Sequence, residues 1–265
     1  MCRIAGWLSK KETIGIVNIL NMLSGMESGG PNAVGIAFWR DGMWKIRKMN
    51  RPFSQALLDE KFQGDLLEAA GSTQVLLHTR FATHGSPDNN MNNHPITSDK
   101  GMVIHNGIVW YPKKNMYPAK GQTDTEQLLG HIERKGIKKG LATARGSIAI
   151  AYVPFQEIGT IWLYRKTSPM VIGKRDGTVV FGSALSLIPK GFTKRVLKDT
   201  SLLKVYNGKI IYQQTMEKSH DFYSRTVSSG SNVPDPEKEI SFSNWNDWQS
   251  YPPRRGRFWI KKTRK

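Results

Sequence analysis

Apolar and polar positions alternate in short blocks over the first 215 residues of the chain. Six blocks are rich in β-branched or aromatic residues and are bounded by Gly, Pro or charged residues, which is typical of β-strands. They are residues 33–39, 74–82, 101–109, 147–153, 160–165 and 178–183. Two longer segments, 12–26 and 123–136, have apolar residues three and four positions apart and predict helices, and residues 55–70 are a third helical candidate.

The helical segment 123–136 carries start and stop signals of its own. Thr123 and Glu126 match the Thr-x-x-Glu pattern of a capping box, and Gly136 closes the segment. The strand segments outnumber the helical ones, but the helices are long enough to cover a sheet. The pattern therefore predicts an α+β layered domain in which helices cover the sheet faces.

The amino-acid composition changes after residue 215. Residues 224–239, SRTVSSGSNVPDPEKE, are polar and poor in apolar residues, which is typical of a linker. We therefore predict one folded domain over 1–215, a polar linker over 216–250 and a basic aromatic tail over 251–265.

Charge adds a second feature. The chain has 39 Lys and Arg residues against 21 Asp and Glu residues, a formal net charge of +18. Seven of the twelve residues in RRGRFWIKKTRK (254–265) are cationic, and aromatic residues lie among and before them. Such a tail suits nucleic acid or another polyanion. A solubilising or partner-docking tail explains the same composition, and both interpretations stay open.

The single cysteine of the chain, Cys2, directly follows the initiator methionine. It has no partner for a disulfide within the chain, and the sequence shows no secretory signal and no apolar segment of bilayer length, so we expect a cytoplasmic protein. Cys2 is either a small core residue or a nucleophile. If Met1 is removed, its thiol shares a residue with a free α-amine of pKa about 7.7–8.0, which can take the thiol proton.

Three further segments supply groups that such a nucleophile needs. Arg80 in HTRFATHG (78–85) can hold a carboxylate with its planar fork. Asn106 and the N–H of Gly107 in VIHNGIV (103–109) form a pair of oxyanion donors. Asp124 in QTDTEQ (122–127) can accept bonds from an ammonium group. A ligand with a carboxylate, an ammonium and a carbonyl open to attack, such as glutamine, fits these groups.

Each of these residues also has a purely structural interpretation. Asp124 can cap a helix, and Arg80 can form a structural ion pair. The four histidines of these segments can be hydrogen-bonded core or surface residues; they are His78, His84, His94 and His105. The histidines lack metal-ligand spacing, so the sequence predicts no metal site and no cofactor.

The order and spacing of the motifs resemble the glutaminase domain of class II glutamine amidotransferases, which are N-terminal-nucleophile hydrolases. The matching segments are MCRIAGW (1–7), GIAFW (35–39), HTRFATHG (78–85), NNHPI (92–96), IHNGI (104–108), TDTE (123–126), RGSIAIAY (145–152), YRKTSPMVIG (164–173) and VVFGSALSLI (179–188). The resemblance covers about residues 1–190, and it implies a four-layer αββα sandwich.

The resemblance also implies a role for each matched residue. Cys2 becomes the nucleophile, with its own α-amine as the general base. Asn106 and Gly107 form the oxyanion hole. Arg80, Thr83 and His84 bind the glutamine α-carboxylate, and Asp124 binds the α-ammonium.

Two positions depart from the family pattern. The family usually opens Met-Cys-Gly-Ile, whereas this chain has Arg3, a bulky cation that either favours the thiolate or crowds the site. The family has an Arg-Gly-x-Asp stretch before the GIAFW strand, whereas this chain reads GGPN, with Gly29 for the arginine and Asn32 for the aspartate.

Three functions remain in view from the sequence. The first is a stand-alone glutaminase subunit that passes ammonia to a separate partner. The second is a hydrolase of other γ-glutamyl amides or peptides with the same fold, some of which begin Met-Cys-Arg. The third is a catalytically weak scaffold that binds nucleic acid through its basic surface and tail.

Overall fold

The computed structural model describes residues 2–112, 117–118 and 120–216. The predicted tail and all of the predicted linker except Met216 lie outside the described residues. Met216 is buried, and its backbone N–H donates to the carbonyl of Thr200 at 2.9 Å, so the folded part reaches at least this residue.

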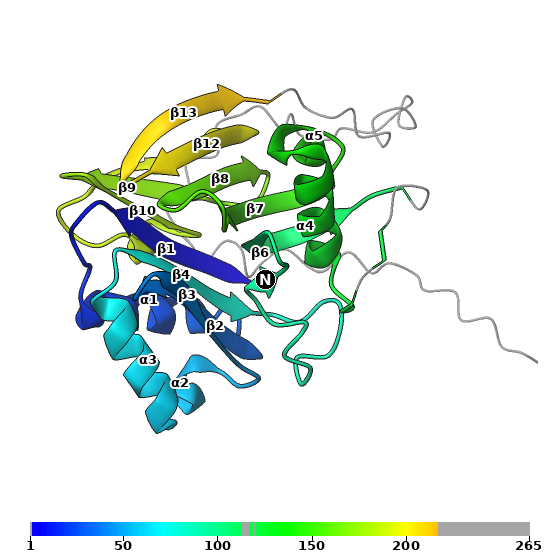
Figure 1. Cartoon of the computed structure of the whole chain (residues 1–265). Helices are drawn as coiled ribbons and strands as arrows, with labels where there is room; N and C mark the ends of the chain where they lie inside the picture. Colours follow the sequence, from blue (N-terminus) through cyan, green and yellow to red (C-terminus); the bar gives the residue numbers. More distant parts are fainter. Residues whose placement is uncertain (1, 113–116, 119, 217–265) are drawn as a thin grey trace, which may run out of the picture. The chain divides into compact units, whose positions relative to one another are not determined.

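Two antiparallel sheets form the centre of the fold (Figure 1). The first has the strand order β11-β9-β10-β1-β4-β2-β3. Its strands are β1 (Arg3–Ser9), β2 (Ala33–Arg40), β3 (Met43–Met49), β4 (Gln74–Arg80), β9 (Val171–Arg175), β10 (Thr178–Gly182) and β11 (Thr193–Val196). The second has the order β13-β12-β8-β7-β6-β5. Its strands are β5 (Ile96–Thr97), β6 (Gly101–Trp110), β7 (Arg145–Pro154), β8 (Thr160–Lys166), β12 (Ser201–Tyr206) and β13 (Lys209–Thr215).

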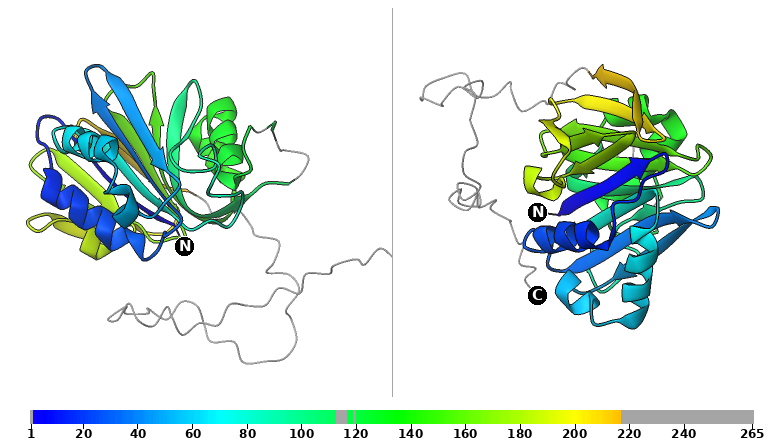
Figure 2. Two further views of the ribbon diagram at one scale, coloured as in Figure 1. Left: turned by 90° about the horizontal axis from the view of Figure 1, so that it is seen from below. Right: turned by 90° about the vertical axis from the view of Figure 1, so that its left-hand side faces the viewer.

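Helices cover the outer face of each sheet (Figures 1 and 2). On the seven-stranded sheet they are α1 (Ile16–Glu27), α2 (Phe53–Ala56) and α3 (Glu60–Ala70), with the short 3-10 helix η2 (Leu185–Leu187) beside α1. On the six-stranded sheet they are α4 (Asp124–Lys135) and α5 (Ile137–Ala142). Three apolar clusters separate the layers: one under α1–α3, one between the sheets and one under α4 and α5. The predicted α+β, four-layer αββα sandwich is confirmed.

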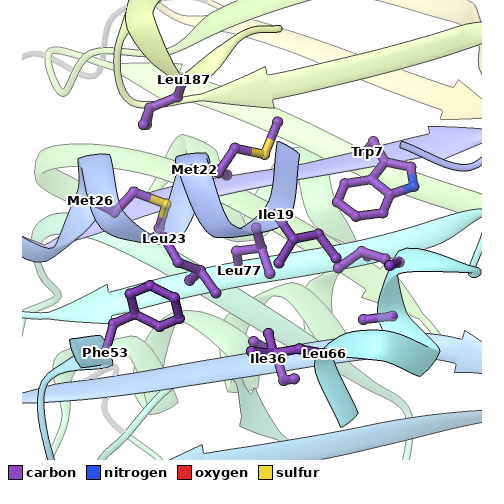
Figure 3. Close-up of a cluster of buried hydrophobic side chains, with 14 of the residues drawn as sticks. Trp7, Ile19, Met22, Leu23, Met26, Ile36, Phe53, Leu66, Leu77 and Leu187 are labelled. Carbon is purple, nitrogen blue, oxygen red and sulfur yellow. The ribbon is translucent and has the colours of Figure 1, made fainter. Parts of the chain in front are cut away.

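Helix α1 shows how periodic apolar positions produce this packing. Ile19, Met22, Leu23 and Met26 recur at helical spacing, and all four are buried against the seven-stranded sheet (Figure 3). Leu77 of β4 lies beneath them in the same cluster.

Strand alternation decides which residues face the space between the sheets. On β1, Ile4 and Leu8 pack in the cluster between the sheets, whereas Ala5 and Trp7 pack against the helices. On β6, Ile104 packs in the cluster between the sheets, and Asn106 is two positions further along the same face. The nucleophile candidate therefore precedes a strand of one sheet, and the oxyanion candidate lies on a strand of the other.

Most of the predicted elements are present, with shifted boundaries. All six predicted strands are found as β2, β4, β6, β7, β8 and β10. The helix expected from residue 12 begins at Ile16, and the candidate over 55–70 divides into α2 and α3.

The capping box of α4 was a wrong prediction. Thr123 is the N-cap residue but makes no side-chain cap hydrogen bond. The Glu126 carboxylate instead accepts the backbone N–H groups of Lys120 at 2.6 Å and Gly121 at 2.7 Å. The Glu126 carboxylate therefore binds the loop that precedes α4 and does not form the capping box with Thr123. Among the described residues, no helix is long and apolar enough to cross a membrane.

Candidate active site

Cys2 lies where β1 begins, beside the end of β4. The register of the two strands pairs Arg3 with Thr79, which brings Cys2 next to the residues that follow β4. The backbone N–H of Phe81 donates to Cys2 Sγ at 3.3 Å, and the thiol approaches the Phe81 carbonyl at 3.5 Å. The sulfur is therefore held at the point where the strand gives way to the HTRFATHG loop.

The electrostatic surroundings keep the Cys2 thiol protonated near neutral pH. Burial raises the pKa of the thiol above its usual value. The Phe81 backbone hydrogen bond and the positive charge of Arg80 lower the pKa, and the Asp124 carboxylate raises it. Since a thiol must lose its proton to act as a nucleophile, this cysteine needs a base close by.

Arg80, the last residue of β4, is buried, and its guanidinium binds its own loop. Nη1 donates to Asn93 Oδ1 at 2.9 Å and to the carbonyl of Ser86 at 3.3 Å. Nη2 donates to the carbonyls of His84 at 2.5 Å and Gly85 at 2.8 Å. Arg80 thereby shapes residues 84–86 as well as facing the site, and a substrate carboxylate would share or displace some of these carbonyls.

The other two residues of the carboxylate-binding prediction lie on the same loop. Thr83 and His84 are both exposed, and Thr83 Oγ1 lies 3.2 Å from His84 Nδ1. Ala82 is fixed by Asn32, whose Oδ1 accepts the Ala82 N–H at 2.9 Å. Asn32, which replaces the family's aspartate, also donates its backbone N–H to the Arg80 carbonyl at 3.0 Å. The neutral residue Asn32 thus holds the backbone on both sides of Phe81, where β4 ends, through hydrogen bonds to Arg80 and Ala82.

Asn106 has a buried side-chain amide without hydrogen-bond partners among the described residues. Its side chain is fully buried, and neither Nδ2 nor Oδ1 has a hydrogen-bond partner among the described residues. An unpaired buried amide costs about 1–3 kcal/mol, so proteins keep such groups only rarely. The amide therefore has hydrogen-bonding capacity that no described residue uses.

Gly107 beside it is restricted to glycine by its backbone and by its neighbour. Its φ of +138° lies in the region that side chains avoid, and a Cβ would lie 1.8 Å from the Ser147 carbonyl oxygen. Glycine at this position therefore allows the Ser147 backbone to approach closely, directly beside the unpaired amide.

Asp124 is the first residue of α4 and joins that helix to β6. Its Oδ2 accepts the backbone N–H of Val109 at 2.8 Å, and its Oδ1 accepts the Thr125 hydroxyl at 3.3 Å. Its charge acts on the pKa of Cys2 and of Arg80, so the three groups share one electrostatic site. Burial lowers the pKa of Arg80, and the negative charges of Cys2 and Asp124 raise it.

A buried histidine cluster lies behind these groups, around the Thr125 hydroxyl. Thr125 Oγ1 is 3.1 Å from His94 Nε2 and 3.0 Å from His105 Nδ1. The hydroxyl donates its one proton to Asp124 Oδ1, so both imidazole nitrogens must donate to its oxygen. His78 stacks on His94 at 4.1 Å between ring centroids and places Nε2 3.1 Å from the His105 carbonyl, which can only accept.

Burial keeps these imidazoles neutral. It lowers the pKa of His78 to about 3 and the pKa of His94 well below its usual value. Burial also lowers the pKa of His105, although the Asp124 charge opposes this shift. Among the described residues, no cluster of His, Cys, Asp or Glu has the geometry of a metal site.

Sequence reasoning missed the residues that support the site. Thr125, Asn32 and Asn93 act through hydrogen bonds to groups distant in sequence. Each gave a signal of its own, because Thr125 lies in TDTE, Asn93 lies in NNHPI and Asn32 departs from the family pattern, but the sequence assigned none of them a role in the site. The structure gathers Cys2, Arg80 and Asp124 around one site with Asn106 nearby, and the assigned roles of these residues remain predictions.

Known proteins resemble this chain in amino-acid sequence. No family model matches the chain. The glutamine–fructose-6-phosphate aminotransferase of Oceanobacillus iheyensis is 30% identical over 194 residues, which cover 67% of this chain and 31% of the relative. The enzyme of the same name from Clostridium tetani is 31% identical over 193 residues, 65% of this chain and 30% of the relative. The chain is a homologue of the class II glutamine amidotransferases. It spans about a third of the length of these curated relatives.

Solved structures of this class share the fold. The glutamine phosphoribosylpyrophosphate amidotransferase of B. subtilis superposes with a TM-score of 0.63 at 18% identity, over 81% of this chain and 49% of that chain. A predicted glutamine amidotransferase from Pseudomonas aeruginosa has a TM-score of 0.50 at 14% identity, over 80% of this chain and 100% of that chain. The resemblance predicted from the motifs is thus confirmed, together with the fold it implied.

Proposed function

We propose that this class II glutamine amidotransferase homologue hydrolyses glutamine to glutamate and ammonia through a thioester on Cys2. The observation that carries the proposal is the fully buried Asn106 amide with both polar atoms unpaired among the described residues, next to Gly107, whose positive φ favours glycine. Two donors directed at one place are what a tetrahedral oxyanion requires.

In the first step, the Cys2 sulfur attacks the side-chain amide carbon of glutamine. The α-amine of Cys2 takes the thiol proton, and the carbonyl oxygen becomes an oxyanion that accepts bonds from the Asn106 amide and the Gly107 N–H. When the intermediate collapses, the protonated α-amine returns its proton to the leaving nitrogen. Ammonia departs, and a γ-glutamyl thioester remains.

In the second step, water attacks the thioester carbon. The α-amine takes a proton from the water, the same two donors bind the second oxyanion, and the C–S bond breaks. Glutamate leaves, and the thiol recovers its proton. The raised thiol pKa makes the base necessary, so the proposal requires that Met1 be removed to free the α-amine of Cys2.

Substrate binding follows from the groups around the thiol. Arg80, with Thr83 and His84 on its loop, would take the α-carboxylate, and Asp124 would take the α-ammonium. Asp124 already has both oxygens oriented by Val109 and Thr125, which leaves its remaining lone pairs in fixed directions.

The test measures intact mass and glutamate release on wild type and Cys2→Ala prepared side by side. We expect the wild-type mass to lack methionine and to release glutamate, and Cys2→Ala to release none above the uncatalysed background. A γ-glutamyl dipeptide is assayed in parallel. Turnover of the dipeptide without turnover of glutamine would replace this proposal with the γ-glutamyl amide hydrolase.

We further propose that the ammonia passes to a separate acceptor enzyme and that the tail 251–265 docks that partner. The seven cations within residues 254–265 support a docking role toward an acidic surface. Replacing these seven cations by Gln in the full chain should weaken capture of the acceptor and leave glutamate release unchanged. Salt-dependent binding of RNA or DNA that disappears in the same variant would favour the nucleic-acid interpretation instead.

A further inference from the structure

The side chain of Arg3 occupies the space where a side chain at position 29 would begin. Arg3 opens β1 directly after Cys2 and is half-buried. A Cβ built on Gly29 would lie 2.6 Å from Arg3 Nε and 2.8 Å from Arg3 Cγ. Arg3 shares its face of β1 with Ala5 and Trp7, so it points toward the helical layer in which Gly29 follows α1.

The backbone does not by itself require glycine at position 29. Gly29 is not among the residues of positive φ, so its backbone conformation is open to other amino acids. Gly30 differs, because a Cβ there would lie 2.4 Å from the Thr79 backbone. The atoms that a side chain at position 29 would meet first belong to Arg3, so the space at Gly29 depends on the conformation of Arg3.

The two sequence departures therefore describe one exchange. The resemblance to class II glutamine amidotransferases implies glycine at position 3 and arginine at position 29, whereas this chain has arginine at position 3 and glycine at position 29. The two departures lie in contact with each other.

The segment that Arg3 covers supports the site. The Gly29 N–H donates to the Met26 carbonyl at 3.1 Å, and the turn then reaches Asn32, which bonds Arg80 and Ala82. These residues flank Phe81, whose N–H donates to the Cys2 sulfur. Arg3 thus packs on the turn that fixes the loop beside the nucleophile.

We propose that Arg3 is a positioning residue for Cys2, supplying from the nucleophile's own strand the cationic side chain that the family pattern places at position 29. It acts by holding the Gly29–Asn32 turn and by adding positive charge near the thiol. The expected effect of Arg3 on glutamine hydrolysis rests on the proposed function. Its effects on the packing of the Gly29–Asn32 turn and on the reactivity of the Cys2 thiol do not.

Charges from three elements act around the thiol. Arg80 from β4 and Asp124 from α4 act on the pKa of Cys2, and Cys2 in turn acts on the pKa of Arg3. The negative charge of the thiolate raises the pKa of Arg3, against the larger effect of burial, which lowers it. The Cys2 thiolate and the Arg3 guanidinium therefore favour each other's charged forms. Arg80 also favours the thiolate form of Cys2.

The first test is the exchange in both directions. Arg3→Gly and Gly29→Arg are each expected to lower kcat/KM for glutamine at least about tenfold, the first by freeing the turn and the second by collision with Arg3. The double variant Arg3→Gly/Gly29→Arg should recover to within about threefold of wild type. A double variant no better than the worse single variant would overturn the proposal.

The second test uses the single thiol of the chain, because iodoacetamide then reports on Cys2 alone. Its alkylation rate is measured against pH in wild type, Arg3→Met and Arg3→Lys. We expect Arg3→Met to slow alkylation at pH 7 about threefold and to move the profile to higher pH, and Arg3→Lys to stay close to wild type. Lys10→Met, which removes an exposed cation beyond the far end of β1, is the matched control.

The alkylation readout separates this inference from the proposed function. If the wild type does not hydrolyse glutamine but Arg3→Met shifts the profile, the positioning role stands and the glutaminase proposal fails. If glutamine is hydrolysed and the profile is the same in all four proteins, the positioning role fails. Where Gly29→Arg variants do not fold, the Met and Lys pair decides the question.

Discussion

The two halves of the candidate site differ in how their polar groups are paired. On the side of the oxyanion donors, the Asn106 amide is buried without any partner among the described residues. On the side that would recognise the substrate backbone, Arg80 and Asp124 are bonded by their own chain through loop carbonyls, Val109 and Thr125. In the proposed function, the unpaired donors would bind a charge that forms only during the reaction, whereas the paired groups would hold their charges in fixed directions before the substrate binds.

This difference predicts that Asn106→Ala separates activity from stability most strongly. Loss of an oxyanion donor should lower kcat about 100-fold to 1,000-fold. The free energy of unfolding should change little, because the amide breaks no hydrogen bond when it is removed. Steady-state kinetics and urea unfolding of the same samples measure both quantities. A large loss of stability with unchanged kcat would show that Asn106 is a structural residue.

Thr125→Val tests the paired half, where stability and recognition should fall together. Valine keeps the shape and removes the hydroxyl that links Asp124 to His94 and His105. We expect the free energy of unfolding to drop by about 1–3 kcal/mol. We also expect KM for glutamine to rise about tenfold, with a smaller change in kcat, since Asp124 loses one of its orienting bonds.

Thr125→Ser is the matched control for this variant. It restores the hydroxyl and should return KM to near its wild-type value. If KM for glutamine is the same in Thr125→Ser and Thr125→Val, the hydroxyl does not orient Asp124. The contrast between the two halves of the site would then rest on packing alone.

The buried histidines give the smallest effect, a dependence of stability on pH. The unfolded chain protonates histidine near pH 6.5, whereas the folded His78 has a pKa of about 3. The folded state is therefore destabilised as pH falls below about 6.5, by about 1.4 kcal/mol per pH unit for each such histidine. Urea unfolding of wild type and His78→Gln at pH 7 and at pH 5.5 should show a smaller loss in the variant. Exposed His84→Gln is the control and should keep the wild-type loss.

The sequence could predict the elements whose signal is local. Helices α1 and α4 follow from apolar spacing, and the strand that ends at Arg80 follows from its β-rich block and the turn after it. Residues 201–215 were not predicted as strands, although they form β12 and β13. Lys204, Lys209 and Gln213 interrupt their apolar alternation, and the two strands are stabilised by pairing with each other, by pairing of β12 with β8 and by burial of the apolar residues of β12.

The candidate site was predictable residue by residue but not in its bonding. Motifs located Cys2, Arg80, Asn106 and Asp124. The partners of Arg80 depend on how residues 84–93 fold back toward β4, and no local pattern specifies that path. The contact of Arg3 with Gly29 joins residues 26 positions apart, so it emerges only when β1 and the turn after α1 are packed together.

The strand order has a consequence for how copies of this protein avoid one another. The seven-stranded sheet ends in β3 on one side and β11 on the other. On β3, Lys45 and Arg47 form ion pairs with Glu68 and Asp65. On β11, Lys194 and Arg195 bond to neutral oxygens of Ile188 and Gln213. An open sheet edge invites a strand from another molecule, and like charges along that edge oppose such pairing. We therefore expect the positive charge of β11 to oppose edge-to-edge pairing, which is a use for part of the net charge of +18 that requires no nucleic acid.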